Sequence, residues 1–261
     1  MCLILIALNH HPRYPLVMAA NRDEYFRRGT APAAFWPDAP NLLAGRDLEA
    51  GGTWLGITRS GRLAAVTNVR EPSRNDPQAH SRGELTRDFL LGDESPQQFL
   101  TNLQSRADAY NGFNLLVGAP DALLYYSNRD QTPRTLPPGL HGVSNHLLNS
   151  PWPKVEQGKA ALGQLLDQPA FALEDLLPLL NNRAQAPDVQ LPDTGVGPEL
   201  ERILSSRFIH APALGYGTRA STALRLDHHG RVEWMEWTWA PDGNLAKTIT
   251  ETFALDSRVD F

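Results

Sequence analysis

The chain has 261 residues, of which 41% are hydrophobic and 20% charged, and its formal net charge at pH 7 is -5. This length and composition predict a single globular domain over residues 1–261, with a sizeable hydrophobic core. The negative charge argues against a nucleic-acid-binding surface, which needs clustered lysines and arginines.

The first third of the chain is expected to form strands. Cys2–Leu8 and Leu16–Ala20 are short apolar runs bounded by turn residues, a pattern typical of buried strands. Trp54–Thr58 and Leu63–Thr67 flank Arg59-Ser60-Gly61-Arg62, which predicts a hairpin.

Two helix starts follow. Ser81 and Glu84 have the spacing of a capping box, which predicts that a helix begins there. Ser95, followed by Pro96 and Gln98, predicts the start of a second helix, because proline is tolerated in the first helical turn.

The second half alternates between strands and helices in the same way. A largely helical stretch is expected over 153–180, in two pieces around Gln168-Pro169, and a helix over Glu199–Phe208. The intervening 182–198 is rich in Pro, Asp and Gly and predicts a loop. The remaining expected strands are 113–118, 123–127, 141–144, 217–226, 231–238 and 247–254.

Hairpins outnumber βαβ crossovers in this order of elements. That favours antiparallel sheets with helices packed outside them, an α+β layered fold. No apolar run approaches the roughly 20 residues of a membrane-spanning helix, and Leu3–Leu8 lacks the basic flank and cleavage site of a signal peptide. We therefore expect a cytoplasmic protein without a membrane span.

Cys2 is the candidate nucleophile, and as the one cysteine it excludes an internal disulfide and a cysteine-based metal cluster. Methionine aminopeptidase accepts small second residues, so removal of Met1 would give Cys2 a free α-amine beside its thiol. An α-amine has a pKa of about 7.7–8.0 and can take a proton from the thiol without a separate histidine. The alternative is that Cys2 is a small buried residue of the first strand.

Asn21-Arg22-Asp23-Glu24, which follows Met1-Cys2 at a short distance, resembles the signature of the NRDE family. Eukaryotic members of this family are called Transport and Golgi organisation protein 2. Further segments resemble the family in the same order along the chain: Gly51-Gly52-Thr53-Trp54-Leu55-Gly56, Thr67-Asn68, Ser81-Arg82-Gly83, Gly142-Val143-Ser144-Asn145 and Tyr216-Gly217-Thr218-Arg219.

The resemblance implies a four-layer αββα sandwich of the N-terminal-nucleophile (Ntn) hydrolase type, in which helices flank two mainly antiparallel sheets. It also implies a distant similarity to choloylglycine hydrolases and acyl-CoA:6-aminopenicillanate acyltransferases. Carried over from the choloylglycine hydrolases, the catalytic site consists of Cys2, Arg22, Asp23, Asn68, Asn145 and Arg219. In this carry-over Cys2 corresponds to the nucleophile, Arg22 to the arginine beside it and Asp23 to an aspartate. Asn68 and Asn145 correspond to two asparagines around the oxyanion and the α-amine, and Arg219 corresponds to a late arginine.

The residue types suit these roles. A cation such as Arg22 lowers the pKa of a nearby thiol, and Asp23 can hold a terminal ammonium or fix Arg22. The amide N–H groups of Asn68 and Asn145 can stabilise an oxyanion, an effect worth about 3 kcal/mol. Alternatively, Arg22 and Asp23 form a surface ion pair, Arg219 belongs to a strained turn, and the two asparagines cap turns.

The expected function is that of an N-terminal-cysteine amidohydrolase or acyltransferase. Its partner would be a small or lipid-like acyl ligand with an amide C–N bond or a thioester, and neither a cofactor nor a metal is required. The alternative on the same scaffold is a non-catalytic carrier of haem or a lipid metabolite, because eukaryotic members are linked to haem handling and to lipid or acyl-CoA metabolism. Cys2, His10 and His11 are then the candidate haem ligands.

Two further features have mainly structural interpretations. His10-His11 and His228-His229 are expected to be solvated turn histidines. Trp237 and Trp239 share a strand face and are expected to pack helices against the sheet, or alternatively to form a wall for an acyl or planar ligand.

Overall fold

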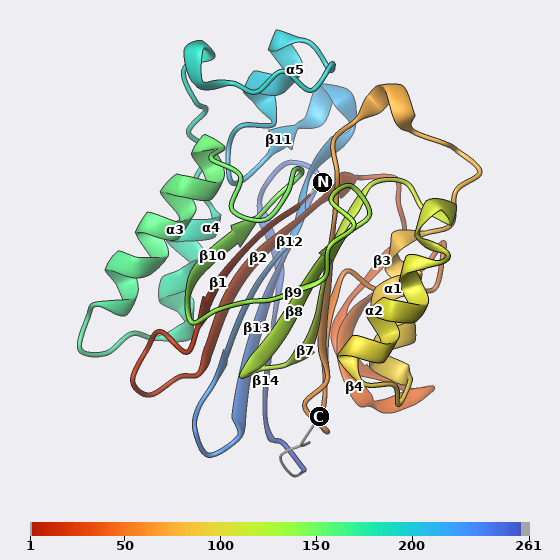
Figure 1. The fold of residues 1–261 in the computed structure, drawn as a ribbon. Helices are drawn as coiled ribbons and strands as arrows, with labels where there is room; N and C mark the ends of the chain where they lie inside the picture. Colours follow the sequence, from red (N-terminus) through yellow and green to blue (C-terminus); the bar gives the residue numbers. More distant parts are fainter. Residues whose placement is uncertain (1, 257–261) are drawn as a thin grey trace.

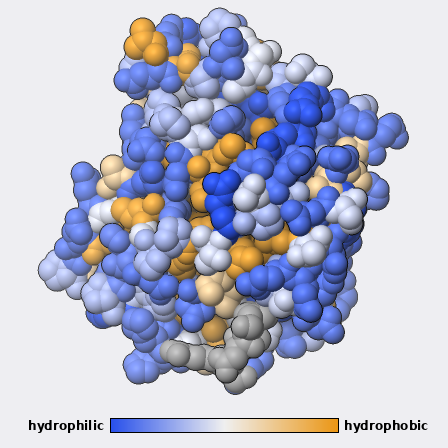
Figure 2. Space-filling view, viewed as in Figure 1, coloured by the Kyte–Doolittle hydropathy of each residue, from blue (hydrophilic) through white to orange (hydrophobic). Residues whose placement is uncertain are grey.

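The computed structural model describes residues 2–256 as a four-layer sandwich (Figure 1). Within these residues two seven-stranded antiparallel sheets lie face to face, and helices cover both outer faces. The expected αββα architecture is confirmed. Figure 2 shows the same layering at the surface, with hydrophilic side chains over the two flanks and hydrophobic ones in the band between them.

Sheet A carries the start of the chain. Its strands are, in spatial order, β10 (Gly139–Val143), β1 (Cys2–Leu8), β2 (Leu16–Tyr25), β12 (Tyr216–Leu226), β13 (Arg231–Trp239) and β14 (Leu245–Ala254), with β11 (His210–Ala211) paired to β12. The central position of β1 and β2 gives both strands a neighbour on each side. The pairing of β1 with β2 starts at Cys2, whereas its pairing with β10 starts at Ile4, so the first two residues of β1 are held by β2 on one side.

Sheet B is a meander in sequence order. Its strands are β3 (Thr30–Trp36), β4 (Ala39–Asp47), β5 (Leu55–Thr58), β6 (Leu63–Asn68), β7 (Phe113–Ala119), β8 (Ala122–Ser127) and β9 (Arg134–Thr135). Each strand pairs with its sequence neighbour. The expected hairpin around Arg59–Arg62 joins β5 to β6, whereas β6 and β7 are joined through the helical segment 69–112.

The helices segregate by sheet. Sheet B is covered by α1 (Arg82–Leu91) and α2 (Pro96–Gln104), and sheet A by α3 (Pro153–Leu166) and α4 (Leu177–Leu180). The short α5 (Pro198–Ile203) lies at the end of the sandwich where β1 begins (Figure 1). Short 3₁₀ turns are η1 (Pro72–Arg74), η2 (Ala107–Ala109), η3 (Leu173–Leu176), η4 (Asp188–Gln190) and η5 (Pro212–Leu214).

Strand β1 shows why the sequence reads as a continuous apolar run. Ile4 and Ile6 pack into the core between the sheets, whereas Leu3 and Leu5 pack under the helices of sheet A. Successive side chains point to opposite faces, and both faces are buried here. Each such side chain contributes about 1.5–3 kcal/mol on burial.

Several expectations about single elements are wrong in detail. Ser81 is the N-cap of α1, but its side chain makes no capping hydrogen bond. The helix expected over Glu199–Phe208 ends at Ile203, because Ser205 and Ser206 return their hydroxyls to nearby backbone carbonyls and compete with helical bonding.

Strands β3 and β4 were not expected from the sequence. Pro32 lies at a register irregularity between Ala31 and Ala34, where a missing N–H is tolerated. By contrast, Trp237 and Trp239 pack beneath the helices of sheet A as expected. In the described part of the chain no helix has both the length and the apolar character of a membrane span.

Candidate functional site

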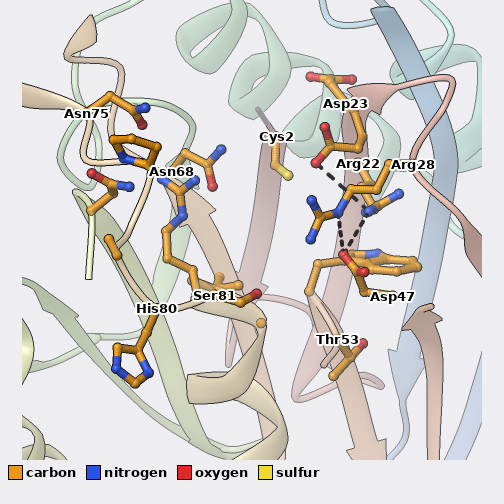
Figure 3. A pocket seen from close by; sticks show the side chains of 18 of the residues that line it. Cys2, Arg22, Asp23, Arg28, Asp47, Thr53, Asn68, Asn75, His80 and Ser81 are labelled. Carbon is orange, nitrogen blue, oxygen red and sulfur yellow. Dashed lines mark hydrogen bonds and ion pairs between the residues drawn. The ribbon is translucent and has the colours of Figure 1, made fainter. Parts of the chain in front are cut away.

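Cys2 opens β1 and lines a cavity of about 320 Å³ at one end of the sandwich (Figure 3). Its side chain is only 8% exposed, so Cys2 is both a buried strand residue and a wall of the cavity. In Figure 3 the sulfur lies between two groups of side chains, with Arg22, Arg28 and Asp47 on one side and Asn68 on the other. The hydroxyl of Ser144 fixes the start of the strand by donating to the Cys2 carbonyl at 2.8 Å.

Arg22 lies directly across from Cys2 in the β1–β2 register. Its guanidinium donates to Thr30 Oγ1 at 3.0 Å, stacks 4.3 Å from the centre of the Trp54 ring and lies 3.6 Å from Asp47 Oδ2. Arg22 is therefore buried and held in place from three directions beside the cavity.

Asp47 is the shared acceptor of two arginines. Its Oδ2 accepts a hydrogen bond from Arg28 Nε at 2.6 Å, and its Oδ1 accepts hydrogen bonds from the backbone N–H groups of Glu49 and Ala50. Burial acts to raise the pKa of Asp47, but the Arg28 hydrogen bond and charge hold that pKa below its usual value. The carboxylate thus stays ionised and neutralises the cations on this side of the cavity.

Asp23 follows Arg22 on β2 but points to the opposite face, because neighbouring strand side chains alternate. Thr218 Oγ1 donates to Asp23 Oδ1 at 2.7 Å, and the Tyr216 hydroxyl donates to its carbonyl at 3.1 Å. Burial raises the pKa of Asp23, while the charge of Lys154 and the Thr218 hydrogen bond act to lower it. The structure thus gives Arg22 and Asp23 separate surroundings.

Burial favours the protonated form of the Cys2 thiol. Burial raises its pKa and the negative charge of Asp23 adds to that effect, whereas the Asp23 backbone N–H and the Arg22 charge lower the pKa. A reaction that uses this sulfur as a nucleophile therefore needs a base to remove the proton.

Asn68 and Asn145 differ in position. Asn68 ends β6 and lines the cavity, whereas Asn145 is fully buried behind it. Asn145 Nδ2 donates to the Asn68 carbonyl at 3.1 Å, and its Oδ1 accepts from Ser144 at 3.2 Å and Lys154 at 3.4 Å. Asn145 thus holds Asn68 in place instead of lining the cavity.

Lys154 has no assigned role in the sequence-based site. It is 3% exposed near the start of α3, and its ammonium interacts with Asn145, Asp23 and Cys2. Burial, together with the charge of Arg70, lowers its pKa to about 8. One lysine at a helix start has no sequence signal for burial, so only the fold reveals it.

Arg82 also lines the cavity, although no role was predicted for it beyond its place in Ser81-Arg82-Gly83. Its Nη1 donates to the Gly112 carbonyl at 3.1 Å. Burial lowers its pKa, and the anionic form of Cys2 is the first of the groups that oppose this effect. The cavity is thus flanked by arginines from both sheet A and α1.

Arg219 lies outside the cavity that contains Cys2. Its Nη1 donates to the carbonyls of Tyr25, Phe26 and Arg28 at 3.0, 3.1 and 3.2 Å. These bonds hold the turn that leads into β3 and thereby position Arg28. The structure brings Cys2, Arg22, Asp23 and Asn68 to the lining of one cavity and places Arg219 outside it.

The two histidine candidates lie at the other end of β1. His10 and His11 follow Leu8, and the seven residues of β1 span roughly 20 Å. His10 is exposed, as expected of a turn histidine, but His11 is buried and its ring stacks on Tyr14 with centroids 5.0 Å apart. Among the described residues no group of three or more His, Cys, Asp or Glu side chains could hold a metal ion.

Comparison with known proteins extends this description. The family model described as Transport and Golgi organisation 2 matches residues 1–241. The chain is 36% identical over 280 residues to the mouse (Mus musculus) Transport and Golgi organization 2 homolog, covering 98% of this chain and 100% of the relative. It is 30% identical over 284 residues to the Drosophila melanogaster Transport and Golgi organization protein 2, covering 96% and 98%.

Among solved structures, the chain resembles the conjugated bile acid hydrolase from Clostridium perfringens. The TM-score is 0.50 and the sequence identity 8%, with 100% of this chain and 99% of the other covered. At this identity the likeness shows a common fold, that of the Ntn hydrolases. The sequence relationship is closer and nearly full-length, and the chain belongs to the Transport and Golgi organisation 2 family.

Proposed function

We propose that the protein, once Met1 is removed, is an N-terminal-cysteine amidohydrolase or acyltransferase that cleaves an amide or thioester bond of a small substrate. The observation that carries this proposal is the position of Cys2. The sulfur of the second residue faces a cavity of about 320 Å³, beside Arg22 and Asn68. Few buried strand residues combine a nucleophilic atom, a cation, an amide and an opening to solvent.

The surroundings of Cys2 determine where the proton goes. Because burial raises the thiol pKa, the free α-amine of Cys2 serves as the base that removes the thiol proton. The thiolate then attacks the carbonyl carbon, the C–N or C–S bond breaks, and the leaving group departs with the proton. Water or an acceptor nucleophile cleaves the resulting acyl-cysteine and restores the thiol.

Neighbouring residues would stabilise the charges formed in this reaction. The Asn68 side chain lines the cavity and can donate to the developing oxyanion, a type of contact worth about 3 kcal/mol. Asp23, buried beside the start of β1, would hold the α-ammonium formed in the first step. Asn145 and Lys154 would act indirectly, because they position Asn68 and Asp23.

The lining favours a small polar substrate over a lipid tail or a haem. Trp54, Val66 and Pro77 give limited apolar surface, and most other lining residues are charged or polar, whereas apolar ligands are usually held by mainly hydrophobic walls. Of the three candidate haem ligands only Cys2 lines this cavity. These residues do not fit a haem.

The test is acylation of the mature protein by a panel of activated amides and thioesters, followed by intact-mass and peptide mass spectrometry. We expect a covalent acyl adduct on Cys2 and turnover that falls by several orders of magnitude in Cys2→Ala. A matched sample that retains an N-terminal extension before Cys2 should be inactive because its amine is blocked. Turnover in Cys2→Ala would show that Cys2 is not the nucleophile. Turnover in the extended form would show that the α-amine of Cys2 is not the base. A Cys2-dependent Soret shift with hemin, without turnover, would instead support the carrier alternative.

A further inference from the structure

The arginines around the cavity differ in whether a carboxylate lies close enough to neutralise their charge. Arg22 lies 3.6 Å from Asp47, and Arg28 lies 2.6 Å from the same carboxylate. Among the described residues, by contrast, no carboxylate oxygen lies within 4.0 Å of the Arg82 guanidinium, which is anchored by the neutral carbonyl of Gly112. Arg82 is thus a partly buried cation without an ion-pair partner among residues 2–256.

The carboxylates of Glu24 and Glu71, whose charges act on Arg82, are already engaged elsewhere. Glu71 forms an ion pair with Arg129, and Glu24 accepts the Tyr25 backbone N–H at 2.8 Å and lies 4.0 Å from Arg22. Both act on Arg82 only at longer range. A desolvated charge without a close partner is unfavourable, and an anionic ligand would relieve that cost.

We infer that Arg82 binds a carboxylate of the substrate, so that the protein selects small amides or thioesters carrying one carboxylate near the bond that Cys2 attacks. This deepens the proposed function and rests on it for the reaction, but not for the binding. Arg82 and Cys2 line the same cavity. The planar guanidinium can form two parallel hydrogen bonds with a carboxylate.

The charge of the lining favours a carboxylate over a phosphate. Asp23, Glu24, Asp47 and Asp76 also line the cavity, and a single uncompensated cation balances a single negative charge. A phosphate monoester carries about -1.5 to -2 at pH 7, so its excess charge would face these carboxylates. We therefore expect inorganic phosphate to compete poorly.

The experiment measures binding in a background that cannot turn over. In mature Cys2→Ala protein, ligand-observed NMR titration would compare N-benzoylglycine with N-benzoylglycinamide, which differ only in the terminal group, an anionic carboxylate in the first and a neutral carboxamide in the second. We expect the carboxylate to bind about tenfold more tightly. This preference should disappear in Cys2→Ala/Arg82→Gln and persist in Cys2→Ala/Arg87→Gln, because Arg87 lies on the same helix but pairs with Asp88.

A second variant keeps the inference testable if Arg82→Gln does not fold. Cys2→Ala/Arg82→Lys keeps the positive charge but loses the planar guanidinium with its paired N–H donors, and it should retain part of the preference for the carboxylate ligand. The inference would be overturned if the Cys2→Ala parent bound the two ligands equally or bound neither of them. It would also be overturned if the preference did not depend on Arg82, or if inorganic phosphate bound more tightly than the carboxylate ligand. If the Arg82-dependent preference is found but no substrate acylates Cys2, the carboxylate site stands and the proposed catalysis falls.

Discussion

At the scale of single residues, Asn68 and Asn145 lie one hydrogen bond apart in different environments. Asn68 lines the cavity, so Asn68→Ala should lower the acylation rate by about 10²–10³-fold with little loss of stability. Asn145 is fully buried with both side-chain atoms bonded, so Asn145→Ala should cost about 1–3 kcal/mol in stability. Acylation kinetics and urea unfolding of both variants check this, and an equal loss of stability in the two would contradict it.

The same scale shows how far sequence reasoning reaches into a site. Cys2, Arg22 and Asn68 were predicted from motifs, and the fold places them around one cavity. Lys154 and Arg82 were given no role, because their importance comes from burial and missing partners, which depend on segments distant in the sequence. The catalytic roles of all six predicted residues stay predictions.

At the scale of elements, β4 controls the site through Trp54. A Cβ atom at Gly45 would overlap the Trp54 ring, which stacks on Arg22. Gly45→Ala should therefore displace Trp54 and Arg22, cost about 1–3 kcal/mol through overpacking and lower the acylation rate. The control Gly29→Ala places its Cβ 3.5 Å from Leu48, an ordinary contact, and should change neither quantity. Thermal unfolding and acylation rates check both, and wild-type behaviour of Gly45→Ala would refute this coupling.

Elements were predictable where local signals agree with the tertiary environment. The helix expected after Ser95 is present, and Ser95 and Gln98 form a capping box at its start. The Ser81 box is absent although its spacing is correct: Ser81 lines the cavity, and the Glu84 carboxylate lies 3.3 Å from His80 Nδ1. Strand β3 was missed since Pro32 and its mostly half-exposed neighbours lack a regular alternation. Pattern alone does not distinguish such an edge strand from a loop.

At the scale of the whole molecule, polar contacts join the two sheets. Thr67 of β6 donates to the Ser144 carbonyl after β10 at 2.6 Å, at the end that holds the cavity. Elsewhere Glu236 of β13 accepts the Ala33 backbone N–H of β3 at 2.7 Å. The sequence predicted two packed sheets but not these links, because each depends on the register between strands far apart in the chain.

Glu236 should make the stability of the whole sandwich depend on pH. Burial raises its pKa from 4.5 to about 7, although the Ala33 N–H and the Thr222 hydroxyl oppose the shift. Between these two values the folded state binds more protons than the unfolded state. The stabilisation is therefore complete below pH 4.5 and is lost as the pH rises through about 7. By this linkage the loss amounts to about 3 kcal/mol at most.

Replacing Glu236 by glutamine keeps the acceptor for Ala33 and removes the charge. Glu236→Gln should match the wild type near pH 5 and exceed its unfolding free energy at pH 8 by about 2–3 kcal/mol. Urea unfolding at both pH values measures this, with the exposed Glu174→Gln as a control that should follow the wild type. A constant difference between Glu236→Gln and the wild type at the two pH values would show that the carboxyl does not titrate between them. The contact between β13 and β3 would then be an ionised one at neutral pH, held by the positive field of Arg22 and the Ala33 amide.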